Sequence, residues 1–183
     1  MDIKVLVPLA QGSEELEAVT IINLFRRAGV QVKIAGENEI ITCARGVKII
    51  PDVLLDSIDT DLQFDSIVIP GGVQGVENLM KHEMLGKMLQ RQKEESKLIS
   101  AICAAPLVLD HFSILKRDAE ITSHPSVKEQ LSKYKWQDKT VVEQDNIITS
   151  KGAGTAIEFT LTLLSRLCGD DTADKIAEEI IYR

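Results

Sequence analysis

The sequence offers little that would support a disulfide-bonded or membrane-spanning protein. It has three cysteines, Cys43, Cys103 and Cys168, an odd number without Cys-x-x-Cys spacing, which argues against a disulfide framework and a thiolate zinc site. Apolar stretches such as Val5 to Ala10 are far shorter than the about 20 residues of a membrane helix. The first residues enter a predicted strand directly, without the pattern of a signal peptide. We therefore expect a protein of the reducing cytoplasm.

Positive charge and nucleotide-binding motifs are also scarce. The chain has 21 Lys and Arg residues against 28 Asp and Glu residues, a formal net charge of −7, and such a surface repels nucleic-acid phosphates and anionic lipids. The turn after the first predicted strand contains only Gly12, so G-x-G-x-x-G is absent, and Gly86-Lys87 lacks the upstream glycine of a phosphate-binding loop. No group of residues has the spacing of metal ligands. We expect no cofactor and no metal, and neither nucleic acid nor a membrane as a partner.

The patterning of the chain predicts one domain, residues 1–183, because 44% of the residues are hydrophobic and no linker or repeat interrupts them. Short apolar runs alternate with helical periodicity, which predicts an α/β layered fold with a mostly parallel central sheet. Arg45-Gly46 predicts the turn of a β-hairpin that projects from this sheet. The expected strands cover residues 3–9, 30–35, 65–69, 97–102, 120–123, 140–142 and 147–150, the hairpin 40–50, and the helices about 14–27, 76–95, 104–109, 156–167 and 172–181.

Three of these strands end in turns of unusual composition, at residues 12–15, 70–72 and 102–104. In parallel sheets, ligands bind beyond the carboxyl ends of the strands. If the three strands are neighbours, the three turns meet at one edge of the sheet, and we expect the functional site there. In the first turn, Ser13 is expected to cap the helix that follows, and Glu14 and Glu15 suit its positive end.

Cys103 lies between an apolar strand and a helix that is expected to begin within one or two residues. A sharp strand-to-helix turn presents its side chain at the top of the sheet, as in a nucleophile elbow. Backbone N–H groups and the helix N-terminus there predict a thiol pKa below its usual value of about 8.5. The alternative is a small thiol that only packs the core. The small side chains of Ala104 and Ala105 leave room for a substrate and favour a reactive cysteine.

Glu17 shares the apolar face of the first helix with Ile21 and Leu24, at helical spacing. A carboxyl group in that position is expected to be partly desolvated, with a raised pKa. Such an acid can share a proton with a nearby sulfur or move a proton on a substrate. The alternative is a first-turn glutamate that only favours the helix dipole.

Gly71-Gly72 follows a buried strand, and His124 ends another strand before Pro125. The two glycines allow close backbone approach and offer N–H groups to an oxyanion, although a tight turn alone would explain them equally well. His124 can line the same edge of the sheet or simply satisfy a turn.

Five motifs in this order resemble those of the ThiJ/PfpI superfamily, and specifically the bacterial proteins of its Parkinsonism-associated (DJ-one-like) branch. The resemblance spans essentially the whole chain. The motifs are Gly12-Ser13-Glu14-Glu15-Leu16-Glu17, Pro70-Gly71-Gly72, Ala101-Ile102-Cys103-Ala104-Ala105-Pro106, Thr122-Ser123-His124-Pro125 and Thr149-Ser150-Lys151-Gly152-Ala153-Gly154-Thr155.

The resemblance implies a flavodoxin-like three-layer sandwich that forms a homodimer. It implies that Cys103 is the nucleophile, that Glu17 shares a proton with it, and that His124 lies near the pocket. The N–H groups of Gly72 and Ala104 would hold an oxyanion, with Gly71 in the same turn. Arg45 would lie at the dimer interface close to the site.

The resemblance further implies a choice of activities, which include glyoxalase activity without glutathione, deglycation of methylglyoxal adducts, chaperone action and oxidative-stress sensing. Our leading hypothesis is chemistry on small 2-oxoaldehydes or their adducts, with Cys103 as nucleophile and Glu17 as proton shuttle. The alternative is a stress sensor or chaperone that acts through oxidation of Cys103. A cysteine peptidase is disfavoured, because Ala104 stands where the protease-like branch has histidine. Ala153 also departs from the family, which often has proline there.

Overall fold

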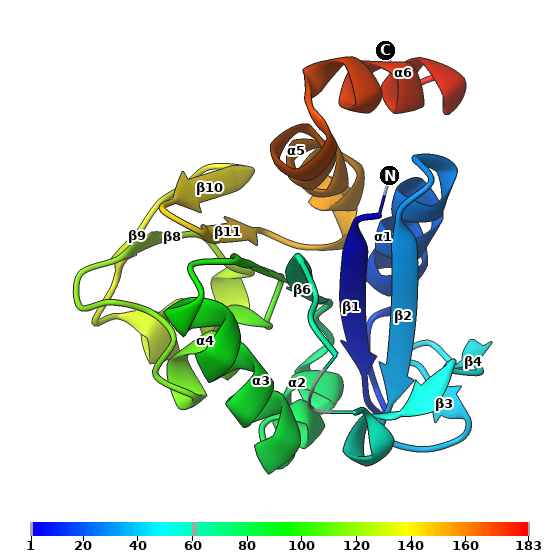
Figure 1. The fold of residues 1–183 in the computed structure, drawn as a ribbon. Coiled ribbons are helices and arrows are strands. Elements are labelled where there is room, and N and C mark those ends of the chain that lie inside the picture. The colour runs from blue at the N-terminus through cyan, green and yellow to red at the C-terminus, as the bar shows by residue number, and fades with distance from the viewer. Residues whose placement is uncertain (1, 60–61, 183) are drawn as a thin grey trace.

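A seven-stranded sheet forms the centre of the protein in the computed structural model, which describes residues 2–59 and 62–182 (Figure 1). Its strand order is β10-β11-β7-β6-β1-β2-β5; β10 and β11 pair antiparallel, and the other neighbouring strands pair in parallel. This confirms the predicted α/β fold with a mostly parallel sheet. The strands are β1 (Lys4–Leu9), β2 (Gln31–Gly36), β5 (Val53–Leu54), β6 (Ser66–Ile69), β7 (Leu98–Ile102), β10 (Val141–Gln144) and β11 (Ile147–Ser150).

Helices cover both faces of the sheet, which gives three layers (Figure 1). Side chains alternate along a strand, so Val5 and Leu6 of β1 enter separate apolar clusters. Val5 belongs to the cluster that contains Phe25 and Phe159, and Leu6 belongs to the cluster that contains Leu89 on the other face. The first face is covered by α1 (Glu15–Arg27), α5 (Ala156–Cys168) and α6 (Asp170–Glu179), and the second by α2 (Val73–Leu79), α3 (Glu83–Glu94) and α4 (Pro106–His111).

The single helix predicted over residues 76–95 is wrong, because two helices, α2 and α3, occupy this region. The chain leaves helical geometry at His82, whose backbone is extended (φ −90°, ψ 97°). After this break, α3 packs closely on Phe112. A Cβ at Gly86 would come within 2.5 Å of the Phe112 ring, so the glycine is needed for that approach. The periodicity of the segment predicted helical structure here but did not mark the turn that divides it into two helices.

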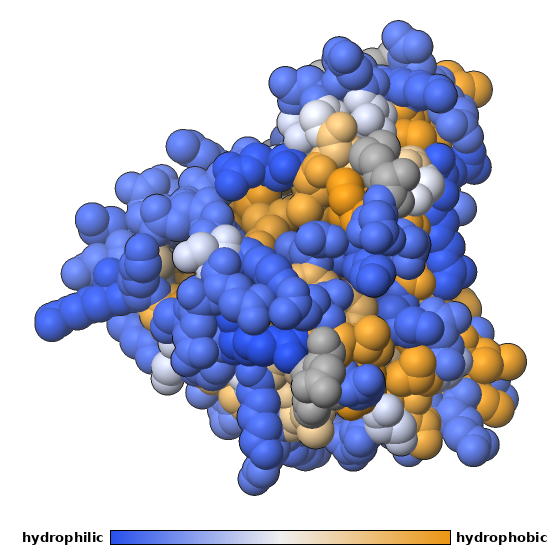
Figure 2. Space-filling view, viewed as in Figure 1, coloured by the Kyte–Doolittle hydropathy of each residue, from blue (hydrophilic) through white to orange (hydrophobic). Residues whose placement is uncertain are grey.

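The predicted hairpin is confirmed as a separate antiparallel pair of β3 (Ile41–Thr42) and β4 (Lys48–Ile49). It projects from the main sheet, and hydrophobic side chains are exposed over it (Figure 2). A second small sheet pairs β8 (Glu120–Ile121) with β9 (Lys135–Trp136). β8 is shorter than the predicted strand 120–123. Residues 122–124 instead run on as irregular chain toward the carboxyl edge of the main sheet.

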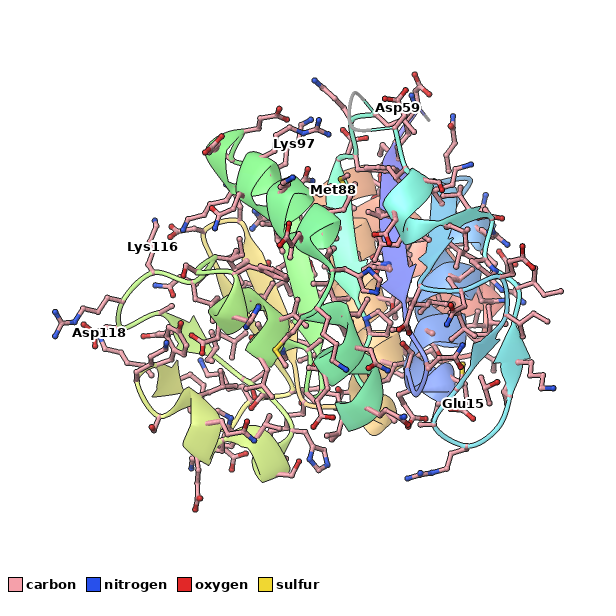
Figure 3. The ribbon with its side chains drawn as sticks, turned by 90° about the horizontal axis from the view of Figure 1, so that it is seen from below. Glu15, Asp59, Met88, Lys97, Lys116 and Asp118 are labelled. Carbon is pink, nitrogen blue, oxygen red and sulfur yellow. The ribbon has the colours of Figure 1, made fainter. Side chains whose placement is uncertain are left out.

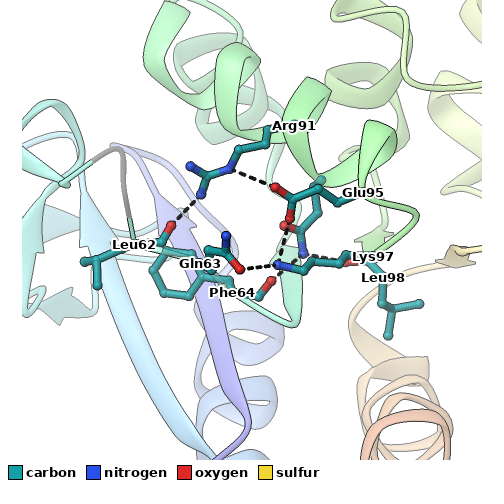
Figure 4. A network of polar contacts seen from close by, with 8 residues as sticks. Leu62, Gln63, Phe64, Arg91, Glu95, Lys97 and Leu98 are labelled. Carbon is teal, nitrogen blue, oxygen red and sulfur yellow. Dashed lines mark hydrogen bonds and ion pairs between the residues drawn. The ribbon is translucent and has the colours of Figure 1, made fainter.

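A polar network ties the C-terminal end of α3 to the segment that precedes β6 (Figure 4). The Arg91 guanidinium donates a hydrogen bond to the carbonyl of Leu62. The Lys97 ammonium contacts Glu95 at 2.7 Å and the Gln63 side-chain oxygen at 3.2 Å. Met88 and Lys97 mark this part of the molecule in Figure 3.

Among the described helices, none has the length and apolar content that a bilayer crossing requires.

Candidate active site

A cavity of about 420 Å³ opens at the carboxyl edge of the sheet, where the predicted turns meet. Six of the seven predicted site residues line it, and the seventh, Gly71, lies directly behind it. The six lining residues are Glu17, Arg45, Gly72, Cys103, Ala104 and His124.

Cys103 adopts a left-handed backbone conformation, with φ +65°, between the end of β7 and the start of α4. Its N–H donates to the carbonyl of Ser150 at 2.9 Å, and its own carbonyl accepts from the N–H of His124 at 2.8 Å. These two bonds fix the turn to both neighbouring segments. A non-glycine residue rarely adopts this conformation, and it is held here at the mouth of a cavity, as expected for a nucleophile elbow. The side chain is half-buried.

Glu17 is fully buried in the first turns of α1. Its Oε2 accepts a hydrogen bond of 2.7 Å from the Gly71 N–H. Its Oε1 has no hydrogen-bond partner among the described residues. Burial raises the pKa of Glu17 to about 7, while the Gly71 N–H and the Cys103 thiol pull it down. The expectation of a desolvated carboxyl with a raised pKa is therefore confirmed.

The expectation of a lowered thiol pKa is wrong. Burial, and next the charge of the Glu17 carboxylate, raise the pKa of Cys103 to about 12. The N–H groups of Gly72 and Ala104 act in the predicted direction and lower it, but burial and the carboxylate outweigh them. A thiolate beside a charged carboxylate is unfavourable, so protonation of Glu17 favours ionisation of the sulfur. The titrations of Cys103 and Glu17 are therefore coupled.

Gly71 supports the pair instead of offering a free N–H group to a substrate. Its N–H is bound to Glu17, and a Cβ at this position would lie 2.5 Å from the Cys103 Cβ and 2.8 Å from the Glu17 Oε2. Gly72 has φ +89°, and a Cβ there would overlap the carbonyl of Gly12. The two glycines are therefore required by close packing and by backbone conformation, respectively.

The first turn differs from expectation at Ser13, which does not cap α1. Its Oγ instead accepts from the Ala10 N–H at 3.0 Å, inside the β1–α1 turn. The hairpin is bound to this turn and to the start of α1. The Ala44 N–H donates to the Ser13 carbonyl, and the Arg45 N–H donates to the Glu15 carboxylate at 3.0 and 3.1 Å. Glu15 lies between the start of α1 and the hairpin (Figure 3). These contacts place the exposed Arg45 at the rim of the cavity.

His124 follows β8 and lines the cavity beside Gly152. A Cβ at Gly152 would lie 3.5 Å from the His124 Cδ2 and 3.8 Å from the Cys103 Sγ, so the ring and the sulfur flank the same small space. Ser126 also lines the cavity; its backbone N–H donates to the His124 Nδ1 over a nitrogen–nitrogen distance of 3.2 Å, and its Oγ lies 2.8 Å from the same Nδ1. Sequence reasoning missed Ser126 and Gly152. The signal for Gly152 was the glycine-rich fifth motif, whereas Ser126 carried none.

Among the described residues, no group of three or more His, Cys, Asp or Glu side chains is placed to hold a metal ion. The cavity is instead lined by one thiol, two carboxyl groups, one guanidinium and one imidazole, with backbone N–H groups between them. Such a set can ionise a thiol, accept and return a proton, and bind a carbonyl oxygen.

The DJ-1/PfpI family model matches residues 3–166. Protein dj-1beta of Drosophila melanogaster is 40% identical over 180 residues, which are 96% of this chain and 95% of that protein. Its crystal structure superimposes with a TM-score of 0.94 at 39% identity, covering 99% and 98% of the two chains. The glutathione-independent glyoxalase DJR-1.2 of Caenorhabditis elegans is 36% identical, covering 93% and 91%. Oxidized DJ-1 of Toxoplasma gondii has a TM-score of 0.91 at 37% identity, covering 98% of each chain.

This chain, which folds as an α/β sandwich with a cysteine elbow and a buried glutamate beside it, therefore belongs to the DJ-1/PfpI family. Within that family, the similarity to Drosophila dj-1beta over nearly its whole length places the chain in the DJ-1 branch.

Proposed function

We propose that this protein converts small 2-oxoaldehydes such as methylglyoxal, or their adducts, into hydroxy acids without glutathione. The observation that carries the proposal is the fully buried Glu17 carboxyl, with a pKa of about 7 and a free Oε1, next to the Cys103 thiol at the cavity. A group that titrates near neutral pH is suited to accept and return a proton during turnover. The similarity to the C. elegans glutathione-independent glyoxalase DJR-1.2 supports the same activity.

In the proposed reaction, the Cys103 sulfur adds to the aldehyde carbon while Glu17 holds the thiol proton. Protonation of the resulting oxyanion gives a hemithioacetal, and the N–H groups of Gly72 and Ala104, which face the sulfur, stabilise the negative oxygen as it forms. Glu17 returns the thiol proton to the oxyanion, and as a carboxylate it then removes the hydrogen on that carbon as a proton and delivers it to the neighbouring carbon. The proton of the hemithioacetal hydroxyl passes to the oxygen on the neighbouring carbon, so that a carbonyl forms on the first carbon and a hydroxyl on the second. The product is a thioester of Cys103, and water hydrolyses it to lactate and the free thiol. With an adduct as substrate, the amine or thiol of the adduct leaves first.

Steady-state turnover of methylglyoxal, measured as lactate formed without glutathione, tests this proposal. Cys103→Ser is expected to form no lactate, and Glu17→Gln to lose a factor of about 10² to 10⁴ in rate. Cys168→Ser is the matched control, because this half-buried thiol lies at the end of α5 and does not line the cavity. Full activity of Cys103→Ser would refute the proposal.

The second candidate is an oxidative-stress sensor or chaperone. The related T. gondii structure is described as oxidized, and the free Oε1 of Glu17 could donate a hydrogen bond to a sulfinate on Cys103. Peroxide as the oxidant would transfer one oxygen atom at each step. Peroxide treatment followed by intact mass measurement separates the two candidates: selective oxygen addition at Cys103, together with negligible lactate formation, favours the sensor.

We further propose that the protein is a homodimer of the cytoplasm and a bacterial member of its branch. Large apolar side chains are exposed on α1 and on the hairpin, among them Leu16 (57% exposed) and Ile50 (76% exposed). Exposed apolar patches of this kind mark association surfaces. Analytical ultracentrifugation is expected to give twice the mass of the 183-residue chain, and Ile50→Glu is expected to shift the equilibrium toward the monomer.

A further inference from the structure

A second cavity, of about 120 Å³, lies at the other edge of the sheet from the candidate active site. It is lined by the residues that directly precede β7 and β11 and by the first residue of β8, so it opens at the amino edge of these strands. The rest of its wall comes from the C-terminal end of α3 and from the chain between α4 and β8. No lining residue is shared with the active-site cavity, so the two are separate sites.

The interior of this second cavity is apolar. Five of its side chains belong to the core cluster of the α2–α3–α4 face, and a sixth packs against that cluster; together they are Ile99, Ile114, Leu115, Ala119, Ile121 and Ile147. Dry apolar cavities of this order of size bind one small ring such as benzene. A phosphate or a sugar would lose its hydration here without finding hydrogen-bond partners. The interior therefore suits a single small hydrocarbon group.

Three lysines line the mouth of the second cavity, and they differ in their partners. The ammonium groups of Lys97 and Lys116, which are labelled in Figure 3, contact carboxylates at 2.7 and 2.8 Å. The Lys93 ammonium donates to the carbonyl of Ser113 at 2.7 Å and has no acidic partner among the residues that the structure describes. An ammonium has three N–H donors, and a carbonyl does not neutralise its charge. Lys93 therefore offers an uncompensated positive charge at the mouth of an apolar cavity.

Two other polar side chains at the mouth bear on the charge of a ligand. The half-buried Asn146 amide has no hydrogen-bond partner within the described part of the chain, so it is a second free donor. Glu120 is exposed and has no cationic partner there, so it repels an anion. The remaining carboxylate, Asp145, is the partner of Lys116.

We propose that this second cavity binds a small monocarboxylic acid whose hydrocarbon part is a ring or a short branched chain. The hydrocarbon part fills the apolar interior, and the carboxylate meets the Lys93 ammonium and the Asn146 amide at the mouth. A cation of the same shape would face the Lys93 charge, and a dicarboxylate would bring a second charge against apolar side chains. The proposal does not rest on the proposed function, because the cavity contains no residue of the candidate active site.

Methyl NMR of the full chain, labelled at its isoleucine side chains, tests the site directly with benzoate as the probe. Benzoate is expected to shift the methyl signals of the four isoleucines of this cavity, and to saturate them with a Kd below about 1 mM. Ile21 and Ile34 lie in the core cluster on the other face of the sheet and serve as internal controls. Benzylammonium has the same ring with the opposite charge and is expected to bind at least about tenfold more weakly. Absence of saturable shifts, equal shifts at the control residues, or equal affinity for the two probes would overturn the proposal.

Three exposed or half-buried variants, none of them in the core, test the placement of the carboxylate by the same titration. Lys93→Gln is expected to weaken benzoate binding about threefold to tenfold, because it removes the uncompensated charge. Lys97→Gln is the matched control and is expected to leave the Kd unchanged, since that ammonium already has a carboxylate partner. Glu120→Gln is expected to tighten binding about twofold, because it removes the repelling charge. Equal effects of Lys93→Gln and Lys97→Gln, or weaker binding by Glu120→Gln, would overturn the placement of the carboxylate at Lys93.

Discussion

Replacing Glu17 by glutamine is expected to change how the stability of the protein depends on pH. The carboxyl group is fully buried, and its pKa rises from 4.5 to about 7 on folding. Between these two values the folded state binds more protons than the unfolded state, so the free energy of unfolding falls as the pH rises. The difference between the two pKa values corresponds to ~3 kcal/mol, of which nearly all is lost by pH 8. Glutamine has the same shape but does not titrate, so this loss is expected to be absent from Glu17→Gln.

Urea unfolding of the two proteins at pH 4.5 and at pH 8 measures the effect. Most other groups titrate equally in both proteins, so the difference in the free energy of unfolding isolates Glu17. Glu17→Gln is expected to gain ~3 kcal/mol relative to the wild-type protein between the two pH values. The same experiment in a Cys103→Ala background keeps the buried carboxyl and removes the thiol, and the effect should persist because burial is its first cause. A difference that does not change with pH would show that Glu17 is not buried as a neutral acid.

Three further predictions follow from the same geometry. The Glu17 carboxylate raises the pKa of the Cys103 thiol, so the rate of Cys103 alkylation by iodoacetamide should rise at a lower pH in Glu17→Gln than in the wild-type protein. Identical midpoints would contradict coupled titration of the two groups. Gly72→Ala should lose at least ~1–3 kcal/mol in urea unfolding, because φ is +89° and the Cβ meets the Gly12 carbonyl, while Gly154→Ala, which has open space around it, should be near neutral. Phe159→Ala, which empties a fully buried position, should cost ~3–5 kcal/mol in the same assay.

The strands of the parallel sheet could be predicted closely because each is a short apolar run that ends in glycine, proline or a polar turn. β11 spans the predicted residues, and β1, β6 and β7 differ by one residue at their first position. The break between α2 and α3 could not be predicted, since the packing of Gly86 on Phe112 is a contact between segments far apart in the chain. The same is true of β9, whose two residues are a strand only through their pairing with β8.

The site was predictable as far as residue types and strand ends allow. The position of Glu17 on an apolar helix face was enough to predict burial and a raised pKa. The sign of the Cys103 shift was not predictable, because it depends on how close the charged Glu17 lies to the sulfur and how far water is excluded, and both are tertiary quantities. The role of the Gly71 N–H was missed for the same reason, since its acceptor lies 54 residues away in the sequence.

The central claim is that the Cys103 sulfur forms the bond to the aldehyde and that Glu17 then moves the proton. Native mass spectrometry of Glu17→Gln mixed with methylglyoxal tests both halves at once, because this variant keeps the thiol but lacks the group that accepts the proton. The mass of one methylglyoxal is expected to accumulate on the protein, to map to Cys103, and to be absent from the Cys103→Ser protein, while little lactate forms. Lactate released at the wild-type rate, or the same adduct on Cys103→Ser, would contradict the account.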